Sequence, residues 1–300
     1  MEAVLRQQIL LRRLERTGVK TSGRSFLHAG TILGAVRHRG FIPWDDDIDV
    51  MLFRSEYDRL CQCAADFQFP YFFQTEYTDP GARRGHAQLR NSATTGILKV
   101  EYPFHFSFNQ GIFLDIFPID HVPDDEGLFD RQIREAWRHK RNCDIFFDIT
   151  GKGLGIPGTG LPKTLYKRLA YQFLIKMGKI GLVRNMLNYQ KEYRKFENAV
   201  TRYNDRETKR VAKYFSLPVD KARRVWPTED FASVVYLPFE FLSVPAPSGY
   251  MDILDRFYRN GWREFQIGTS SHGGVYFDTD IPYQEYWRAE EKEPLTEEKG

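Results

Sequence analysis

Residues 40–53 read GFIPWDDDIDVMLF, and four aspartates fall within five positions directly before an apolar run. Polar and apolar residues alternate from Asp47 to Val50 and an apolar run follows, which predicts a β-strand over residues 47–53. Side chains alternate between the two faces of a strand, so Asp47 and Asp49 share one face while their apolar neighbours face the core. Two carboxylates about 7 Å apart on one face repel each other unless a cation lies between them. The start of this strand is therefore a candidate cation site.

Mg²⁺ is the first candidate for this cation, with Mn²⁺ as the alternative. A hard ion of this kind binds one or two carboxylates and takes its other ligands from water and substrate phosphate. A second interpretation is a solvated acidic turn in which Asp45 and Asp46 are the exposed part. A third is a calcium loop, because the acidic spacing through Glu56 matches an EF-hand. The position that requires glycine holds Val50 inside the apolar run, which disfavours the calcium loop.

A Gly30-Thr31 turn precedes the acidic stretch, between a strand predicted over residues 25–29 and a helix predicted over residues 31–39. Glycine lets a ligand approach the backbone closely. The N-terminus of a helix offers unpaired N–H groups and the positive end of a dipole. Gly30 and Thr31 are therefore candidates for binding phosphate beside the acidic site.

A third acid, Asp115, lies in an otherwise apolar segment, GIFLDIFPID at residues 111–120, which predicts a strand that ends at Pro118. A lone carboxylate is costly to bury, so Asp115 needs a partner. It is either a salt-bridged core aspartate or a third acid that shares the metal with Asp47 and Asp49. Glycine with serine or threonine, then Asp-x-Asp, then a later aspartate on a strand resembles the signature of the nucleotidyltransferase fold.

The remaining pattern predicts an α/β (α+β) protein built on a mixed sheet. A chain of 300 residues is long enough for one large core or two small ones. We expect a nucleotidyltransferase core in residues 20–123, a helical block in residues 124–215, and a C-terminal segment in residues 216–300 that packs back on the core. The expected helices lie over residues 2–17, 55–67 (opened by a Ser55-x-x-Asp58 capping box), 125–148 and 163–210, and further strands lie in residues 85–92, 95–103 and 234–247.

Composition excludes several classes of function. Lysine and arginine number 43 against 40 acidic residues, and this net charge of +3 is too small for a nucleic-acid-binding domain. Three cysteines without a second cluster support neither a zinc site nor a disulfide framework, and they fit a reducing compartment. No apolar run approaches the length of a membrane span, and the amphipathic N-terminus lacks the apolar centre of a signal peptide. We therefore expect a cytoplasmic protein.

The segment LHAGTILGAVRHRGFIPWDDDIDVML, residues 27–52, closely resembles the LicD family, a group of phosphocholine transferases that also includes the fukutin-related proteins. The resemblance continues in AQLRNSATTGI, GIFLDIFPIDHVPDD and VYLPFEFLSVPAPSGYMDILDRFY, so it covers most of the chain outside the helical block. It implies a nucleotidyltransferase fold. It also implies transfer of a phospho-alcohol, such as phosphocholine from CDP-choline, to a hydroxyl of a cell-surface glycan or its lipid-linked precursor, as in modification of lipopolysaccharide or teichoic acid, with release of CMP.

The resemblance also implies roles for individual residues. Asp47 and Asp49 bind the metal, and Asp115 is either a third ligand or the base that takes the acceptor proton. The metal bridges donor phosphate oxygens and neutralises charge on the leaving CMP. Arg37 and Arg90 are candidate phosphate contacts because the guanidinium fork suits phosphate oxygens. Each of the two arginines is alternatively a surface ion pair.

The roles of four other residues are open or have two interpretations. Asn91 stands where the family often has aspartate, which leaves the role of that position open. Trp44 and Phe41 are candidates for stacking on a nucleotide base, and packing within their loop is preferred. His272 in the segment SSHGG is a candidate second base, and an ordinary loop histidine is preferred.

Three other functions use similar residues. A metal-dependent glycosyltransferase also uses Asp-x-Asp, but such folds place a full nucleotide-binding α/β unit before it. A nucleotidyltransferase that transfers NMP uses the same acids, whereas a non-catalytic binding module would lack one of them.

Residues 163–187 mix basic and apolar side chains, which fits either peripheral contact with an anionic membrane or a helix packed on the core, and the second is preferred. The glycine-rich loop at 151–163 lacks the spacing of a P-loop.

Overall fold

The computed structural model describes residues 7–14, 25–150, 187–214, 218–259, 261–264 and 274–292, together with Phe173 and Lys176. Four predictions lie outside these residues: the two ends of the first helix, the loop at 151–163, nearly all of the segment 163–187, and His272.

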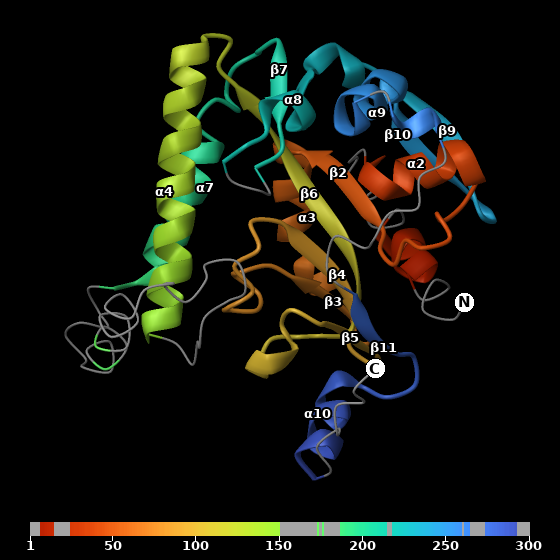
Figure 1. Ribbon diagram of the computed structural model, residues 1–300, viewed down its shortest axis with the longest axis vertical. Helices are drawn as coiled ribbons and strands as arrows, with labels where there is room; N and C mark the ends of the chain where they lie inside the picture. Colours follow the sequence, from red (N-terminus) through yellow and green to blue (C-terminus); the bar gives the residue numbers. More distant parts are fainter. Residues whose placement is uncertain are drawn as a thin grey trace.

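A mixed sheet forms the centre of the protein (Figure 1). Its main path runs β1–β2–β6–β4–β3, and β6 is parallel to β2 but antiparallel to β4. The far end of β6 pairs with β7, which pairs with β8. These strands are β1 (Phe26–Leu27), β2 (Asp49–Phe53), β3 (Tyr71–Gln74), β4 (Ala87–Asn91), β6 (Ile112–Val122), β7 (Arg210–Ala212) and β8 (Val225–Pro227). Two antiparallel pairs lie off this path, β9 (Val234–Phe239) with β10 (Leu242–Pro247) and β5 (Thr95–Leu98) with β11 (Val275–Asp278).

Helices flank this sheet on both sides. Helices α4 and α7 lie side by side at one edge of the molecule, and α2, α9 and the β9–β10 hairpin lie at the other (Figure 1). Besides residues 7–14, the described α-helices are α2 (Ala29–His38), α3 (Arg54–Gln62), α4 (Glu126–Thr150), α7 (Tyr189–Val200), α8 (Lys221–Arg224), α9 (Tyr250–Tyr258) and α10 (Tyr283–Lys292). Within the described ranges, no helix combines the length and the apolar character needed to cross a membrane. The predicted α/β fold class with a mixed sheet is confirmed.

The two central strands alternate as the sequence predicts. Even-numbered residues such as Val50 and Ile116 lie in the largest core, together with residues from α2, the β9–β10 hairpin and α9. Odd-numbered residues such as Met51 and Phe117 lie in a smaller core that includes Trp226. Because side chains alternate along a strand, the aspartates at odd positions of β2 and β6 share the face of this smaller core.

Strand β6 continues through Pro118 to Val122, so the prediction that proline ends this strand is wrong. Asp115 donates its backbone N–H toward β2, so the position of residue 118 faces the opposite edge of β6. On that edge the pairing with β4 ends at Ile116, and the pairing with β7 begins only at Asp120. Proline therefore removes no hydrogen bond of the ladder at this position.

Two helix predictions also differ from the structure. The helical pattern predicted to residue 210 ends at Val200, and β7 follows because Val211 and Ala212 are fully buried beside β6. The predicted capping box at Ser55 does not form, since α3 begins at Arg54 without a side-chain cap. The first difference arises from the pairing of β7 with β6, which lies far away in the sequence.

A buried ion pair fastens α3 to the sheet. The Arg54 guanidinium donates from Nε to Asp120 Oδ1 at 2.7 Å and from Nη2 to Oδ2 at 2.9 Å. Asn204 donates a further hydrogen bond of 2.7 Å to the same carboxylate. The two charged side chains are 9% and 1% exposed, so neither is compensated by bulk water.

Replacing Asp120 with asparagine should lower the free energy of unfolding by about 3–5 kcal/mol, because the Arg54 charge stays buried without its counter-ion. Denaturant titration measures this loss. The matched control is Asp205→Asn, which breaks an exposed pair with Arg206 and should change stability by no more than about 0.5 kcal/mol. Equal effects of the two substitutions would contradict the role assigned to the buried pair.

Candidate metal centre

The structure brings three of the predicted acids together. Asp49 is the first residue of β2, and it lies directly opposite Asp115 in the parallel pairing of β2 with β6. Asp47 precedes the strand by two residues. Asp47, Asp49 and Asp115 each offer one carboxylate oxygen, and these oxygens lie within 4.8 Å of one another. Hydrogen bonds of the sheet, including that from Asp115 N–H to Ile48 O at 2.9 Å, fix this register.

The corner between β1 and α2 holds the backbone of Asp49 on both sides. The N–H of His28 donates to the carbonyl of Asp49 at 3.0 Å, and the N–H of Asp49 donates to Thr31 Oγ1 at 2.8 Å. Ala29 makes the corner tight, with a φ of 46° in the left-handed region. Thr31 therefore positions a carboxylate through its side chain, and the phosphate contact predicted for its backbone stays a prediction.

Gly30 makes room for a carboxylate at the N-terminus of α2. A Cβ atom at this position would lie 2.1 Å from Asp45 Oδ2, so only glycine fits there while Asp45 keeps its place. The N-terminus of a helix favours negative charge. The predicted role of Gly30 as a phosphate cradle stays a prediction, since in this structure the Asp45 side chain lies against it. Asp45 also forms an acidic group with Asp46 and Asp47.

Two neutral side chains from the β4 side orient Asp115. Gln88 Nε2 donates to Asp115 Oδ1 at 2.6 Å, and His86 Nε2 lies 3.1 Å from the same oxygen. Burial lowers the pKa of His86, which favours the neutral ring, although Asp115 opposes this shift. A neutral ring binds a carboxylate by donating from the nitrogen that faces it, which is Nε2 here. Sequence reasoning missed both residues. Their signal was present, because polar side chains at positions 86, 88 and 90 alternate with Ala87 and Leu89.

Arg90 lies on the same face of the sheet as Asp115, and Gln88 connects the two side chains. Its guanidinium is fully buried and donates to Gln74 Oε1 at 2.7 Å, to the Gly111 carbonyl at 2.7 Å and to Gln88 Oε1 at 2.5 Å. Arg90 is therefore linked to Asp115 through Gln88, and its predicted contact with donor phosphate stays a prediction. Because Arg90 is fully buried, the alternative interpretation as a surface ion pair does not fit the structure. Neighbouring Asn91 caps the turn after β4 by accepting from the N–H of Ala93 at 3.1 Å.

A lysine from a distant part of the chain reaches the acids. Lys213 follows β7 directly and is 4% exposed, and its Nζ lies 3.9 Å from the centroid of the Phe117 ring. Phe117 is two residues along β6 from Asp115 and shares its face. Burial lowers the pKa of Lys213 to about 8, and Asp49 is the largest opposing influence. No local pattern in the sequence points to Lys213, which lies in the predicted helical block.

Tyr258 of α9 is within electrostatic range of the acids, and Arg37 is within range of Tyr258. Burial, followed by the charges of Asp45 and Asp49, raises the pKa of Tyr258, and Arg37 opposes this shift. Arg37 is in the last turn of α2, about 10 Å along the helix from Gly30. It donates to the carbonyl of Trp262 at 3.2 Å. Its predicted contact with phosphate stays a prediction.

The aromatic side chains of the acidic loop pack on the core. Phe41 and Trp44 contact the largest core, and the Phe41 ring lies 4.9 Å from that of Phe239. Phe41 and Trp44 therefore pack within the protein, as the preferred interpretation of the sequence predicts. Val50 lies within β2, where it is 1% exposed, so the acidic segment does not follow the turn of an EF-hand.

The electrostatics of the acids fit a hard divalent cation. Burial raises the pKa of Asp49 well above its usual value, and Asp47 adds to the shift. Burial and the neighbouring Asp47 likewise raise the pKa of Asp45 to about 7. Burial and the neighbouring carboxylates both disfavour the ionised form of these acids. A bound Mg²⁺ or Mn²⁺ would favour the ionised form, because it supplies a nearby positive charge. Asp47, Asp49 and Asp115 supply oxygen ligands of the kind such ions prefer.

Comparison with known proteins matches this part of the chain to a described family. Residues 23–146 match LicD/FKTN/FKRP, nucleotidyltransferase domain. The lipopolysaccharide cholinephosphotransferase LicD of Haemophilus influenzae is 25% identical over 239 residues, which cover 77% of this chain and 79% of that protein. The uncharacterized protein RP689 of Rickettsia prowazekii is 30% identical over 108 residues, which cover 31% of this chain and 39% of that protein. The matched domain contains all the predicted acids, whereas Lys213 and Tyr258 lie beyond it.

The raised pKa of Asp45 predicts a pH-dependent stability in metal-free buffer. Because the pKa is about 7 in the folded protein and near 4 in the unfolded chain, protonation stabilises the folded state. Lowering the pH from about 8 to about 6 should therefore add about 1 kcal/mol of stability. Asp45→Asn removes this titration, so the melting temperature of the variant relative to wild type, measured in EDTA, should be highest at pH 8 and fall toward pH 6. A difference that does not vary with pH would contradict the assignment.

Proposed function

Because residues 23–146 form a nucleotidyltransferase domain of the LicD family, we propose that this protein transfers a phospho-alcohol from a CDP-activated donor to a hydroxyl of a glycan, with release of CMP. Phosphocholine is the first candidate for the transferred group, and lipopolysaccharide or its lipid-linked precursor for the acceptor, because the relative that matches 77% of the chain is a lipopolysaccharide cholinephosphotransferase. The observation that carries the proposal is the convergence of Asp47, Asp49 and Asp115 within 4.8 Å.

In this proposal the three acids hold Mg²⁺ or Mn²⁺, which supplies positive charge for the donor diphosphate when it is bound. Asp115 is a third ligand in this proposal, because one of its carboxylate oxygens lies within 4.8 Å of those of Asp47 and Asp49. Gln88 and His86 hold this carboxylate in its orientation. The alternative role, a base that takes the acceptor proton, stays a prediction. Lys213 adds a second positive charge on the same face of the sheet, where negative charge develops on the leaving phosphate.

Two alternative functions differ from this proposal in observable ways. A metal-dependent glycosyltransferase would have a complete nucleotide-binding α/β unit before its Asp-x-Asp motif. In the part of the chain that the structure describes, only residues 7–14, β1 and α2 precede Asp49. Transfer of NMP from a nucleoside triphosphate uses the same acids. It is distinguished from phospho-alcohol transfer by the released product, which is pyrophosphate rather than CMP.

The direct test incubates the full chain with Mg²⁺ and a panel of CDP-choline, CDP-ribitol and CDP-glycerol, with and without lipopolysaccharide. CMP release is measured by chromatography, and transfer to the acceptor by mass spectrometry. CMP release that depends on both metal and acceptor is the expected result. Release of pyrophosphate from CTP in place of CMP from the CDP-alcohols would establish NMP transfer instead.

Asp47→Asn and Asp49→Asn should each lower kcat/KM by about 10²- to 10³-fold, because each removes a metal ligand but almost no volume. Isothermal titration with Mn²⁺ should show weakened metal binding in both variants. The control is Asp205→Asn on the surface, which should leave both measurements unchanged. Near-wild-type activity of either ligand variant at saturating Mg²⁺ would remove that residue from the metal site.

Lys213→Met should lower kcat/KM for the donor by about 10- to 100-fold, because methionine keeps an apolar stem over Phe117 but loses the charge. Lys213→Arg should retain part of the activity. The acceptor KM should stay near the wild-type value in both variants. Melting temperatures within a few degrees of wild type distinguish this loss from a general loss of folding. Wild-type donor kinetics in Lys213→Met would show that this lysine only balances the charge of the acids.

A further inference from the structure

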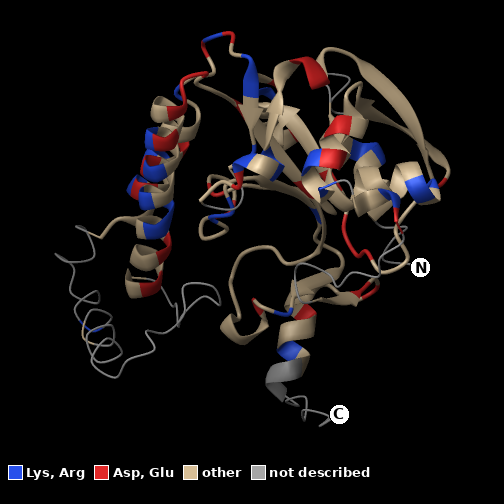
Figure 2. Ribbon diagram, turned by 45° about the horizontal axis from the view of Figure 1, so that its top comes forward, with Lys and Arg blue, Asp and Glu red and all other residues tan. Residues whose placement is uncertain are grey.

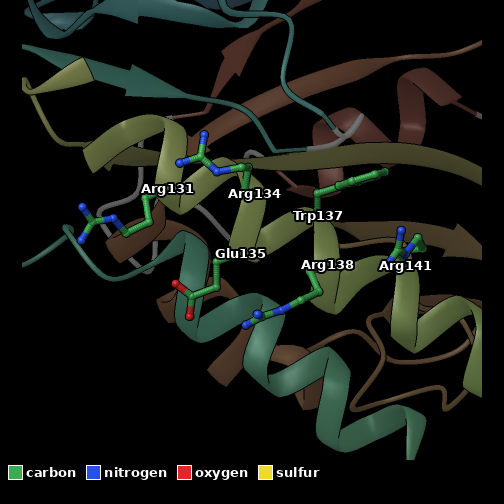
Figure 3. A pocket seen from close by; sticks show the side chains of 6 residues that line it. All are labelled: Arg131, Arg134, Glu135, Trp137, Arg138 and Arg141. Carbon is green, nitrogen blue, oxygen red and sulfur yellow. The ribbon is translucent and has the colours of Figure 1, made fainter. Parts of the chain in front are cut away.

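The outward face of α4 carries four arginines and one tryptophan, with Glu135 at its border (Figure 3). All five side chains are exposed, and Trp137 is 41% exposed. We call this set the Arg–Trp face; it comprises Arg131, Arg134, Trp137, Arg138 and Arg141. Figure 2 shows that charged residues gather densely along this helix.

The arginines form one stripe because of their spacing. At about 100° per residue, the four positions fall within an arc of about 80°, and they extend about 15 Å along the helix. The opposite side of α4 is buried, with Phe129, Ala136 and Cys143 in the core that α4 shares with α7. The packing of α4 therefore fixes the Arg–Trp face toward the outside of the protein.

Other charges of α4 form ion pairs, whereas the described hydrogen-bond and ring partners of the stripe arginines are neutral. Arg138 Nη2 lies 3.3 Å from His139 Nε2, and the Arg141 guanidinium lies 4.9 Å from the centroid of the Trp137 ring. Arg202 binds Glu135 through two hydrogen bonds of 2.8 Å. Lys140 binds Asp144 at 2.7 Å, and Lys221 binds Glu126 at 2.6 Å. Among the residues that the structure describes, the four arginines of the stripe take part in no such ion pair.

This arrangement has an electrostatic cost that an anionic partner would relieve. Like charges three or four residues apart on a helix repel each other. A face that serves only for solubility usually mixes charges of both signs, as the rest of α4 does. The stripe alone carries more positive charge than the net +3 of the whole chain, so its charge is local.

We propose that the Arg–Trp face docks the protein peripherally on a membrane surface rich in anionic lipids. One guanidinium group can donate two parallel hydrogen bonds to the phosphate oxygens of a headgroup. Anionic leaflets attract basic residues. Tryptophan favours the level of the headgroups, where its ring is partly apolar and its N–H is hydrated. The proposal does not depend on the proposed activity, although such docking would bring the acidic site to a lipid-linked acceptor.

The test measures co-sedimentation of the full chain with vesicles. One set contains phosphatidylcholine alone, and the other contains about one-third phosphatidylglycerol. Binding to the anionic vesicles and not to the neutral ones is expected, with a steep loss when the salt concentration rises from about 0.1 M to about 0.5 M.

The decisive variant replaces the four arginines of the stripe with glutamine. Each basic residue near an anionic surface strengthens binding roughly fivefold, so the quadruple variant should bind anionic vesicles more than tenfold less well. The matched control removes the same charge from exposed arginines elsewhere, namely Arg12, Arg59, Arg256 and Arg288, and should keep most of the binding. Melting temperatures within a few degrees of wild type establish that both variants are folded.

The tryptophan is tested separately. Brominated lipids quench tryptophans that lie at the headgroup level, and Trp137→Phe should abolish most of the quenching seen in wild type. Any of three results would overturn the proposal: no binding of wild type to anionic vesicles, equal losses in the stripe and control variants, or stripe-dependent binding to a soluble polyanion such as heparin without binding to vesicles.

Discussion

The parallel pairing of β2 with β6 is the interaction on which the rest of the site depends. It sets Asp49 directly opposite Asp115 and concentrates negative charge on one face of the central sheet. Such an arrangement is unfavourable unless other charges and dipoles offset it. The structure supplies the N-terminus of α2 on one side of the acids and Lys213 on the other. Lys213 is buried, and the Asp45 carboxylate lies against Gly30 at the start of α2.

A buried polar layer behind the acids gives this geometry its rigidity. Arg90 donates to Gln88, and Gln88 in turn donates to Asp115. Arg90 is itself fixed by Gln74 and by the backbone of Gly111. A fully satisfied network of this kind holds a side chain in one orientation, whereas a partly satisfied one would destabilise the core. The arginine that is a candidate phosphate contact in the sequence therefore also supports the site.

The later half of the chain contributes side chains to the site that no local sequence pattern predicts. Strand β7 joins the far end of β6 and places Lys213 over Phe117. Helix α9 contributes Tyr258 beside Asp45 and Asp49. The division into a core at residues 20–123, a helical block and a C-terminal segment stays a prediction, but the acidic site draws side chains from beyond the first of these. The Arg–Trp face, by contrast, lies entirely on α4 and is visible as a spacing of arginines.

The sequence by itself determined the features that arise from neighbouring residues. The alternation around Asp47 and Asp49, the Gly30-Thr31 turn and the isolated Asp115 follow from strand periodicity and turn chemistry, which act over a few positions. Only the tertiary structure decided that β6 passes through Pro118, that Asp45 lies against Gly30, that Arg90 is buried behind Asp115, and that Lys213 reaches the acids. Each of these depends on pairing between segments far apart in the chain. Local propensity carries no information about such pairing, because its free energy comes from burial and hydrogen bonds that exist only once the sheet has formed.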